Sequence, residues 1–117
     1  MTVLVAIPES PEGQSALLAA AHEAKLLGTG LVALNLGLRR LDESTLPSNV
    51  ELTVIERSAP HHDPAQVVLD YLDAHPEITR LVIGIKHRSP VGKAVFGSVS
   101  QRLLLEAKVP VLAVKPH

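Results

Sequence analysis

Five short segments rich in aliphatic residues, separated by segments with helical spacing, constrain the fold of this chain more than any other feature of its sequence. They lie at residues 3–7, 31–36, 49–56, 80–85 and 110–114. The first holds no polar residue, which is typical of a strand buried on both faces of a parallel sheet. Strands that alternate with helices form right-handed β-α-β units, which place helices on both faces of an open sheet. The sequence therefore predicts an α/β fold.

The composition limits what such a fold can be used for. Of the 117 residues, 46% are hydrophobic, 2% are aromatic and none is cysteine. We expect one domain over residues 1–117 with an aliphatic core, and no disulfide or thiolate chemistry. No apolar segment approaches the about 18 residues that span a membrane, and the first residues lack the features of a signal peptide. We expect a cytoplasmic protein that binds no membrane and, at a net charge of −1, no nucleic acid.

Helix signals fill the gaps between the strands. Ser10 and Pro11 suit the N-cap and first position of a helix that Gly28 ends. The polar residues 37–49 predict no more than a short turn of helix. Two further helices are each expected to begin with a capping box, formed by Asp63 with Gln66 and by Ser98 with Gln101.

Residues 84–98 connect the fourth expected strand to the last helix, at the sheet edge where open parallel sheets bind ligands. Free N–H groups and the dipole at the start of that helix favour an anion, and Gly97 lets the backbone approach a phosphate without a Cβ in the way. Alternatively, the glycines of this connection only satisfy turn geometry. A P-loop is excluded, because Ala94 follows Gly92-Lys93 where a P-loop needs a hydroxyl.

Charge is distributed unevenly along the chain. Residues 78–105 contain five basic residues and no acidic one, whereas the rest of the chain contains six basic and twelve acidic residues. A local excess of this kind suits an anionic ligand. A solvated loop whose charges aid solubility would show the same pattern, and charge alone leaves both interpretations open.

The spacing Gly84-x2-His87-x9-Gly97-Ser98 resembles the phosphate and ribose loop of the universal stress protein family, with His87 in place of the second glycine. The similarity extends to residues 3–7, 63–65, 81–84 and 109–114. It implies an open parallel sheet with strand order 3-2-1-4-5, as in the adenine nucleotide alpha hydrolase-like fold. The second helix would be shortened over residues 37–49, where family members usually have more helix.

The resemblance also implies that ATP or AMP binds beside the loop, with Mg²⁺ only if the ligand is ATP. Ile7 and Leu36 would flank the adenine. Pro8 stands where the family has an acidic residue, and His87 would either bond a phosphate or block one. The residues expected at the nucleotide are Ile7, Pro8, Leu36, Gly84, Lys86, His87, Arg88, Gly92, Lys93, Gly97, Ser98 and Val99.

No catalytic or metal-binding group is predicted. Adjacent histidines in residues 61–63 point in different directions, which does not suit a metal site, and Glu9 and Glu12 form no readable acid–base pair. We therefore expect a protein that is not an enzyme. A slow phosphohydrolase in which Lys86 or His87 stabilises developing charge remains an alternative.

The last strand, at residues 110–114, would lie at an edge of the implied sheet. Exposed apolar edges are covered, charged or paired in proteins, so we expect a homodimer through this strand. The predicted function is a universal stress protein that binds an adenine nucleotide and acts as a dimeric regulatory module. The alternatives are a dimeric module without ATP that binds an unidentified protein partner, and a protein whose basic loop binds another small anion.

Overall fold

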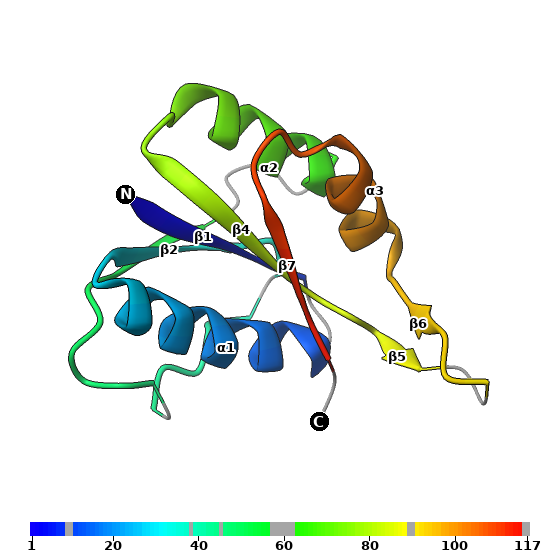
Figure 1. The fold of residues 1–117 in the computed structure, drawn as a ribbon, viewed down its shortest axis with the longest axis horizontal. Helices are drawn as coiled ribbons and strands as arrows, with labels where there is room; N and C mark the ends of the chain where they lie inside the picture. The colour runs from blue at the N-terminus through cyan, green and yellow to red at the C-terminus, as the bar shows by residue number, and fades with distance from the viewer. Residues whose placement is uncertain (9–10, 38, 45, 57–62, 89–90, 116–117) are drawn as a thin grey trace.

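The computed structural model describes residues 1–8, 11–37, 39–44, 46–56, 63–88 and 91–115, and strands and helices alternate in it as expected (Figure 1). The elements are β1 (Thr2–Ile7), α1 (Pro11–Leu27), β2 (Gly30–Asn35), β3 (Leu52–Glu56), α2 (Pro64–Ala74), β4 (Ile78–Gly84), β5 (His87–Arg88), β6 (Ala94–Val95), α3 (Ser98–Glu106) and β7 (Val111–Val114).

Five of these strands form one parallel sheet in the order β3-β2-β1-β4-β7, which confirms the predicted order 3-2-1-4-5. From β1 the chain passes through α1 to β2 and then β3, on one side of β1. It returns through α2 to β4 on the other side and ends in β7. The strand order therefore reverses between β1 and β4, and the carboxyl ends of these two strands define the edge where a ligand is expected.

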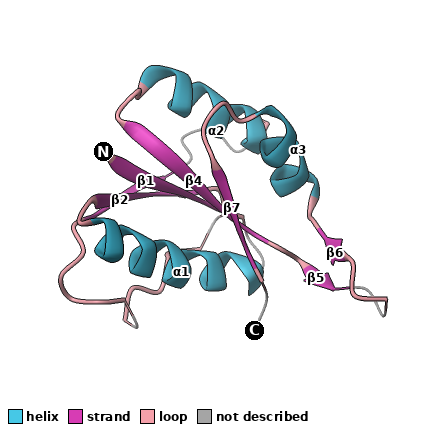
Figure 2. Cartoon of the chain, viewed as in Figure 1, coloured by secondary structure: helices cyan, strands magenta, loops and turns pink. Residues whose placement is uncertain are grey.

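Helices cover both faces of the sheet, as Figure 2 shows with α1 on one side and α2 and α3 on the other. Alternate residues of β1 supply the two cores. Val3 and Val5 belong to the cluster that includes Leu17 of α1, whereas Leu4 belongs to the cluster that includes Val68 of α2. Both faces of β1 are buried, which explains why its sequence is continuously apolar.

The connection between β2 and β3 has no helix in the residues that the structure describes. Three partly buried side chains, Leu41, Leu46 and Val50, pack against the core on the α1 face instead. The prediction of a polar connection with little helix is confirmed for this part. These three apolar contacts cover sheet surface that a second helix would otherwise cover.

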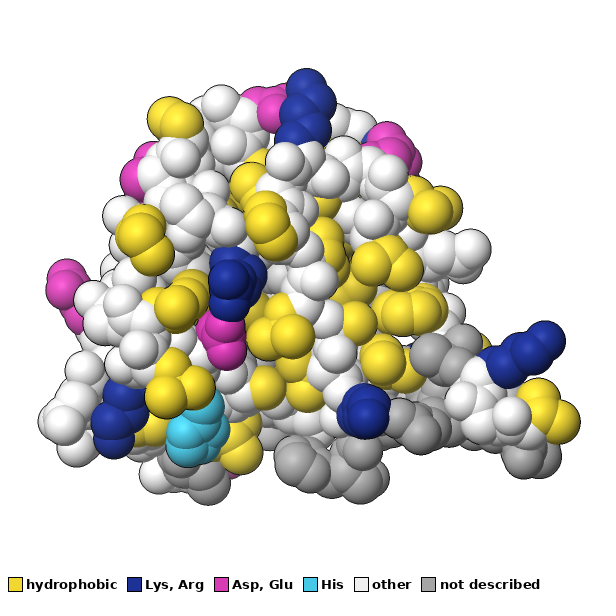
Figure 3. All heavy atoms as spheres, viewed as in Figure 1, with side chains coloured by type: hydrophobic (Ala, Val, Ile, Leu, Met, Phe, Trp, Pro, Cys, Tyr) yellow, Lys and Arg dark blue, Asp and Glu magenta, His cyan; other side chains and the backbone are white. Residues whose placement is uncertain are grey.

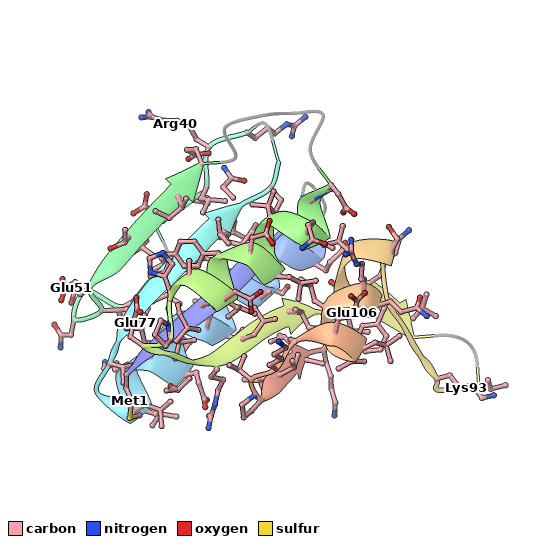
Figure 4. The ribbon with its side chains drawn as sticks, turned by 90° about the horizontal axis from the view of Figure 1, so that it is seen from above. Met1, Arg40, Glu51, Glu77, Lys93 and Glu106 are labelled. Carbon is pink, nitrogen blue, oxygen red and sulfur yellow. The ribbon has the colours of Figure 1, made fainter. Side chains whose placement is uncertain are left out.

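The connection between β4 and α3 differs from the open loop that we expected. Strands β5 and β6 pair antiparallel, and the N–H of Lys86 donates to the carbonyl of Val95 at the base of this hairpin (2.8 Å). The hairpin extends beyond the sheet, with Lys93 at its far end in Figure 4. Gly92, at a φ of 83°, allows the chain to turn back. Strands of two residues are too short to produce an alternating pattern in the sequence.

The ends of α1 and α2 agree in part with the predictions. Gly28 has a φ of 66° and ends α1, as expected, while the predicted N-cap Ser10 lies outside the described residues. The Asp63 side chain accepts a hydrogen bond from the N–H of Ala65 (3.1 Å) and so caps α2. The predicted reciprocal bond from Gln66 is wrong, because the side-chain amide of Gln66 donates to Asp70 (2.8 Å) instead.

The N-cap of α3 is Gly97, and Ser98 is the first residue of the helix. No side chain caps this end, so the predicted capping box of Ser98 and Gln101 is wrong. The N–H of Gln101 donates to the carbonyl of Gly97 (2.9 Å), which is the first bond of the helix. Sequence placed the helix start one residue too late, because glycine and serine both occur at N-caps.

Gly84→Ala tests how closely α1 lies on the sheet. A Cβ on Gly84 would lie 2.7 Å from the carbonyl oxygen of Glu12, so backbone would have to shift. We expect a loss of about 1–3 kcal/mol in the free energy of unfolding, measured by urea denaturation. Gly30→Ala is the control, because its Cβ would meet its nearest neighbour at an ordinary 3.6 Å. Equal unfolding midpoints for the two variants would contradict the prediction.

Candidate functional site

The candidate site lies at the carboxyl ends of β1 and β4, and two glycines let the first turn of α1 press onto both strands. A Cβ on Gly13 would lie 2.8 Å from the carbonyl oxygen of Pro8 and 2.9 Å from Cγ2 of Ile7. Gly84 has the equivalent close approach to Glu12. The amino end of α1 therefore spans the point where the strand order reverses.

This packing bears on the predicted role of Gly84 as a phosphate contact. The residue is buried, and it pairs with Val114 of β7 in the sheet. The close contact with α1 is by itself a sufficient reason for a glycine at this position. Gly13, which sequence reasoning did not single out, has the same requirement. Two glycines at a sheet edge beside one helix are a signal for such a contact.

Gly97 is different, because nothing in the described structure requires a glycine there. Its φ is −67°, which any residue adopts, and a Cβ would meet no atom within 4 Å. The first bond within α3 is donated by Gln101, so the N–H groups of Ser98, Val99 and Ser100 have no acceptor within the helix. The result is open space beside Gly97, at the positive end of a helix whose first three N–H groups have no acceptor within the helix.

The residues expected to flank the adenine are brought together through their backbones. The N–H of Leu36 donates to the carbonyl of Ile7 (2.9 Å), at the ends of β2 and β1. Both side chains are buried, and they belong to different cores, Ile7 on the α1 face and Leu36 on the face of α2 and α3. The two side chains therefore do not form one common apolar surface at this edge.

Asn35 fixes the same edge and was missed by sequence reasoning. Its buried side-chain amide donates to the carbonyl of Arg39 (2.7 Å) and to Glu56 Oε2 (3.0 Å), and its Oδ1 accepts from the N–H of Gly37 (3.1 Å). These bonds hold the turn after β2 against the end of β3. A single asparagine at the end of an aliphatic strand is the signal in the sequence for this role.

The five basic residues of residues 78–105 have different partners in the structure. Arg80 pairs with Glu23 of α1, and Arg102 pairs with Asp63 at the start of α2. Arg102 also donates to Glu106 Oε2 (2.8 Å), and this hydrogen bond is the main cause that raises the pKa of the guanidinium above its usual value, followed by Asp63. Two of the five cations thus form ion pairs that connect elements of the fold.

The other three cations belong to the segment that includes the hairpin. Lys86 and Lys93 are exposed, Lys86 directly after Ile85 and Lys93 at the far end of the hairpin (Figure 4). The backbones of His87 and Arg88 form β5, but their side chains lie outside what the structure describes. The structure therefore gathers the predicted cations along one projecting segment without placing them around one point.

Metal ligands and membrane spans were searched for in the described part of the chain. No group of three or more His, Cys, Asp or Glu residues could hold a metal ion there. No helix there is long and apolar enough to cross a membrane. The histidines at 61 and 62 lie outside the described residues.

A hollow of about 230 Å³ opens between α2 and the end of α3, away from every predicted site residue. It is lined by Gln66, Leu69, Leu72, Asp73, Glu106, Lys108 and Val109. Because α3 ends there, this hollow lies at the opposite end of that helix from Gly97.

An open parallel sheet whose order reverses at two carboxyl ends, beside an uncapped helix start, defines a doubly wound α/β protein, a class whose ligands bind at such an edge. The model of the universal stress protein family matches residues 39–115. A universal stress protein of Mycolicibacterium smegmatis is 38% identical over an alignment of 128 residues that covers 98% of both chains. The chain belongs to the universal stress protein family.

Solved structures show the same fold. A universal stress protein from Archaeoglobus fulgidus is 25% identical, with a TM-score of 0.72 and 98% of each chain covered. A structure of the A. fulgidus protein in complex with dAMP is 24% identical, with a TM-score of 0.69 at the same coverage. UspA from Lactobacillus plantarum is 17% identical, with a TM-score of 0.70, and 98% of this chain and 97% of that chain are covered.

Arg102→Met tests whether this cation holds α3 to α2. We expect a lower urea midpoint, because Asp63 and Glu106 both lose their partner, and a smaller loss in 1 M salt, where exposed charges are screened. Glu106→Gln is the control, since it removes only the pair within α3. An Arg102→Met midpoint equal to that of Glu106→Gln would show that the bond between the two helices contributes nothing.

Proposed function

We propose that this protein binds an adenine nucleotide, ATP or AMP, at the carboxyl edge of β1 and β4. The observation that carries the proposal is Gly97, a glycine that neither its φ nor its neighbours require, at the uncapped start of α3. A bare backbone at a helix start, where the first N–H groups have no acceptor within the helix, suits a phosphate. The A. fulgidus protein with the same fold binds dAMP, which supports this ligand class.

In this proposal the N–H groups of Ser98 and Val99 bind phosphate, and the cations of the hairpin segment approach it from the side. Lys86, Arg88 and Lys93 are the candidates, with Gly92 allowing the turn and His87 at the base of the hairpin. Mg²⁺ accompanies the ligand only if it is ATP. The edge formed by Ile7, Pro8 and Leu36 then faces the base through its backbone.

The module acts in the cytoplasm as a dimeric regulator and is not an enzyme in this proposal. A second candidate is binding of another small anion at the same helix start. It is favoured by one observation, since Pro8 places no carboxylate at the end of β1 where the family has an acidic residue. In either case backbone N–H groups at the helix start hold the anion.

Strand β7 supports the proposal of a homodimer. Among the strands that the structure describes, it pairs only with β4, and each of its four residues is at least partly exposed, Leu112 at 37%. Figure 3 shows hydrophobic side chains gathered on the face that β7 crosses in Figure 1. Leu105 of the neighbouring α3 is 75% exposed. Pairing with β7 of a second copy would satisfy the outer backbone groups and cover these side chains.

Gly97→Val tests the nucleotide site by calorimetric titration with ATP, AMP and inorganic phosphate. We expect affinity for all three to fall at least about tenfold, because a branched side chain fills the space that a phosphate needs. The protein should keep its fold and lose no more than about 1 kcal/mol of stability, since the Cβ has free space and only the N-cap preference is lost.

The matched control is Gly30→Ala, at the other end of the sheet. A Gly97→Val variant that binds ATP as tightly as the wild type would place the site elsewhere. Binding of phosphate but not of AMP or ATP by the wild type would favour the small-anion alternative.

Leu112→Glu tests the dimer by light scattering at micromolar concentration. We expect the wild type to have twice the mass of the 12.5 kDa chain and the variant to dissociate or precipitate, because a carboxylate would be buried at the two-fold axis. Leu26→Glu is the control, as Leu26 is 84% exposed on α1. A wild type of 12.5 kDa would rule the dimer out.

A further inference from the structure

The proposed nucleotide site does not use the hollow of about 230 Å³ between α2 and the end of α3. The two helices lie side by side over one face of the sheet (Figure 2). On one side the hollow is lined by Gln66, Leu69 and Asp73, whose spacing puts them on one face of α2. On the other side it is lined by the last residue of α3 and by the connection to β7. The hollow lies at the opposite end of α3 from Gly97, so a ligand here would be separate from a nucleotide.

Three of the side chains that line the hollow are aliphatic. Leu69, Leu72 and Val109 pack against the core on the face of α2 and α3, yet each keeps part of its surface exposed. An aliphatic group in the hollow would remove more of this surface from water, which favours binding. The volume of about 230 Å³ has room for about eight non-hydrogen atoms, at roughly 30 Å³ each as for water in the liquid. The hollow therefore suits a small ligand with an aliphatic part.

Two charged side chains line the hollow without an ion pair between them. Asp73 and Lys108 are both exposed, and among the described residues neither takes part in an ion pair or in a side-chain hydrogen bond. Glu106, the third charged residue of the lining, is already paired with Arg102 (2.8 Å). The hollow thus offers one carboxylate and one ammonium group, which complements a ligand that carries both charges.

The ends of the two helices favour a cation near Asp73. Helix α2 ends at Ala74, one residue after Asp73, and α3 ends at Glu106. Neither helix has a basic residue in its last turn. The partial negative charge of the last carbonyl groups of α2 therefore adds to the charge of Asp73. Lys108, which follows the end of α3, is the basic side chain of the lining and suits an anion.

We propose that this hollow binds the zwitterion of an aliphatic α-amino acid of the size of valine or leucine. The α-ammonium group of the ligand pairs with Asp73 and its carboxylate pairs with Lys108. Its side chain covers Leu69, Leu72 and Val109. Both ion pairs are exposed to solvent, where such pairs contribute little, so we expect an affinity in about the millimolar range. The inference does not depend on the proposed nucleotide function.

Two other interpretations of the hollow make different predictions. If Asp73 and Lys108 are only solvated surface charges, no small ligand prefers the hollow. If the hollow accepts any aliphatic cation, the carboxylate of an amino acid contributes nothing and Lys108 repels the ligand. For a zwitterion both side chains are favourable, so removal of either charge weakens binding.

The test is an NMR titration of the isotope-labelled full chain with leucine and with two analogues that each lack one charge. Isoamylamine has no carboxylate, and isocaproate has no ammonium group. We expect leucine to shift the amide signals of Leu69, Leu72 and Val109 saturably at about millimolar concentration. Leucine should bind about threefold or more tightly than either analogue, which is the size of effect expected from exposed charge pairs.

Two variants should change this preference in opposite ways. Lys108→Met keeps the length of the side chain but removes its charge, and should weaken leucine about threefold without weakening isoamylamine. Asp73→Asn keeps the size but removes the charge, and should weaken leucine about threefold without weakening isocaproate. Lys25→Met is the control, because Lys25 is exposed on α1, which covers the other face of the sheet, and it should keep the wild-type affinities.

Three outcomes would overturn the proposal. The first is a wild type in which leucine leaves the amide signals at the hollow unshifted. The second is leucine that binds no more tightly than isoamylamine, which would make the hollow a cation site. The third is a pair of variants, at Asp73 and at Lys108, that bind leucine as the wild type does while the rest of the amide spectrum shows that they are folded.

Discussion

The close contact between the first turn of α1 and the ends of β1 and β4 is the constraint on which the rest of this structure depends. It is possible because Gly13 and Gly84 have no side chains, so helix backbone can lie directly on strand ends. The contact fixes where the crossover from β1 to β2 starts. It also places the positive end of α1, and Glu12 with it, at the reversal of strand order. One packing requirement therefore fixes the start of α1 at the strand ends where the proposed ligand edge lies.

The sheet could be predicted from sequence because burial on both faces leaves a strong pattern. A strand such as β1, with one core on either side, must be apolar at every position. The helices between the strands instead repeat their apolar residues about every 3.6 positions. The hairpin of β5 and β6 gave no such pattern, because two residues per strand establish no period and neither strand lies in the main sheet. The start of α3 was misplaced for a related reason, since local sequence does not show whether Ser98 caps the helix or begins it.

The nucleotide site stays a prediction, whereas the places of its residues in the fold can be compared with the sequence. The glycine spacing located the loop after β4, and Gly97 has the open surroundings expected of a phosphate contact. Charge was a poorer guide, because Arg80 pairs with Glu23 at a separation of 57 residues and Arg102 with Asp63 at 39 residues. Partners so distant cannot be paired by reading along a chain. The burial of Glu12 was equally invisible, since an acidic residue in a first helical turn is ordinarily solvated.

The ligand edge and the exposed edge strand are joined by backbone. Gly84 pairs with Val114, and the N–H of Ile85 donates to the carbonyl of Val114 (2.8 Å), one residue before the hairpin segment begins at Lys86. A nucleotide that contacts Lys86 or Gly97 would therefore act on a chain segment that directly follows a residue bonded to the end of β7. If pairing of β7 between two copies favours the same arrangement, thermodynamic linkage requires the dimer to bind the nucleotide more tightly by the factor by which the nucleotide strengthens the dimer. In the function proposed above, the bond between Ile85 and Val114 is the short path by which nucleotide binding would affect assembly.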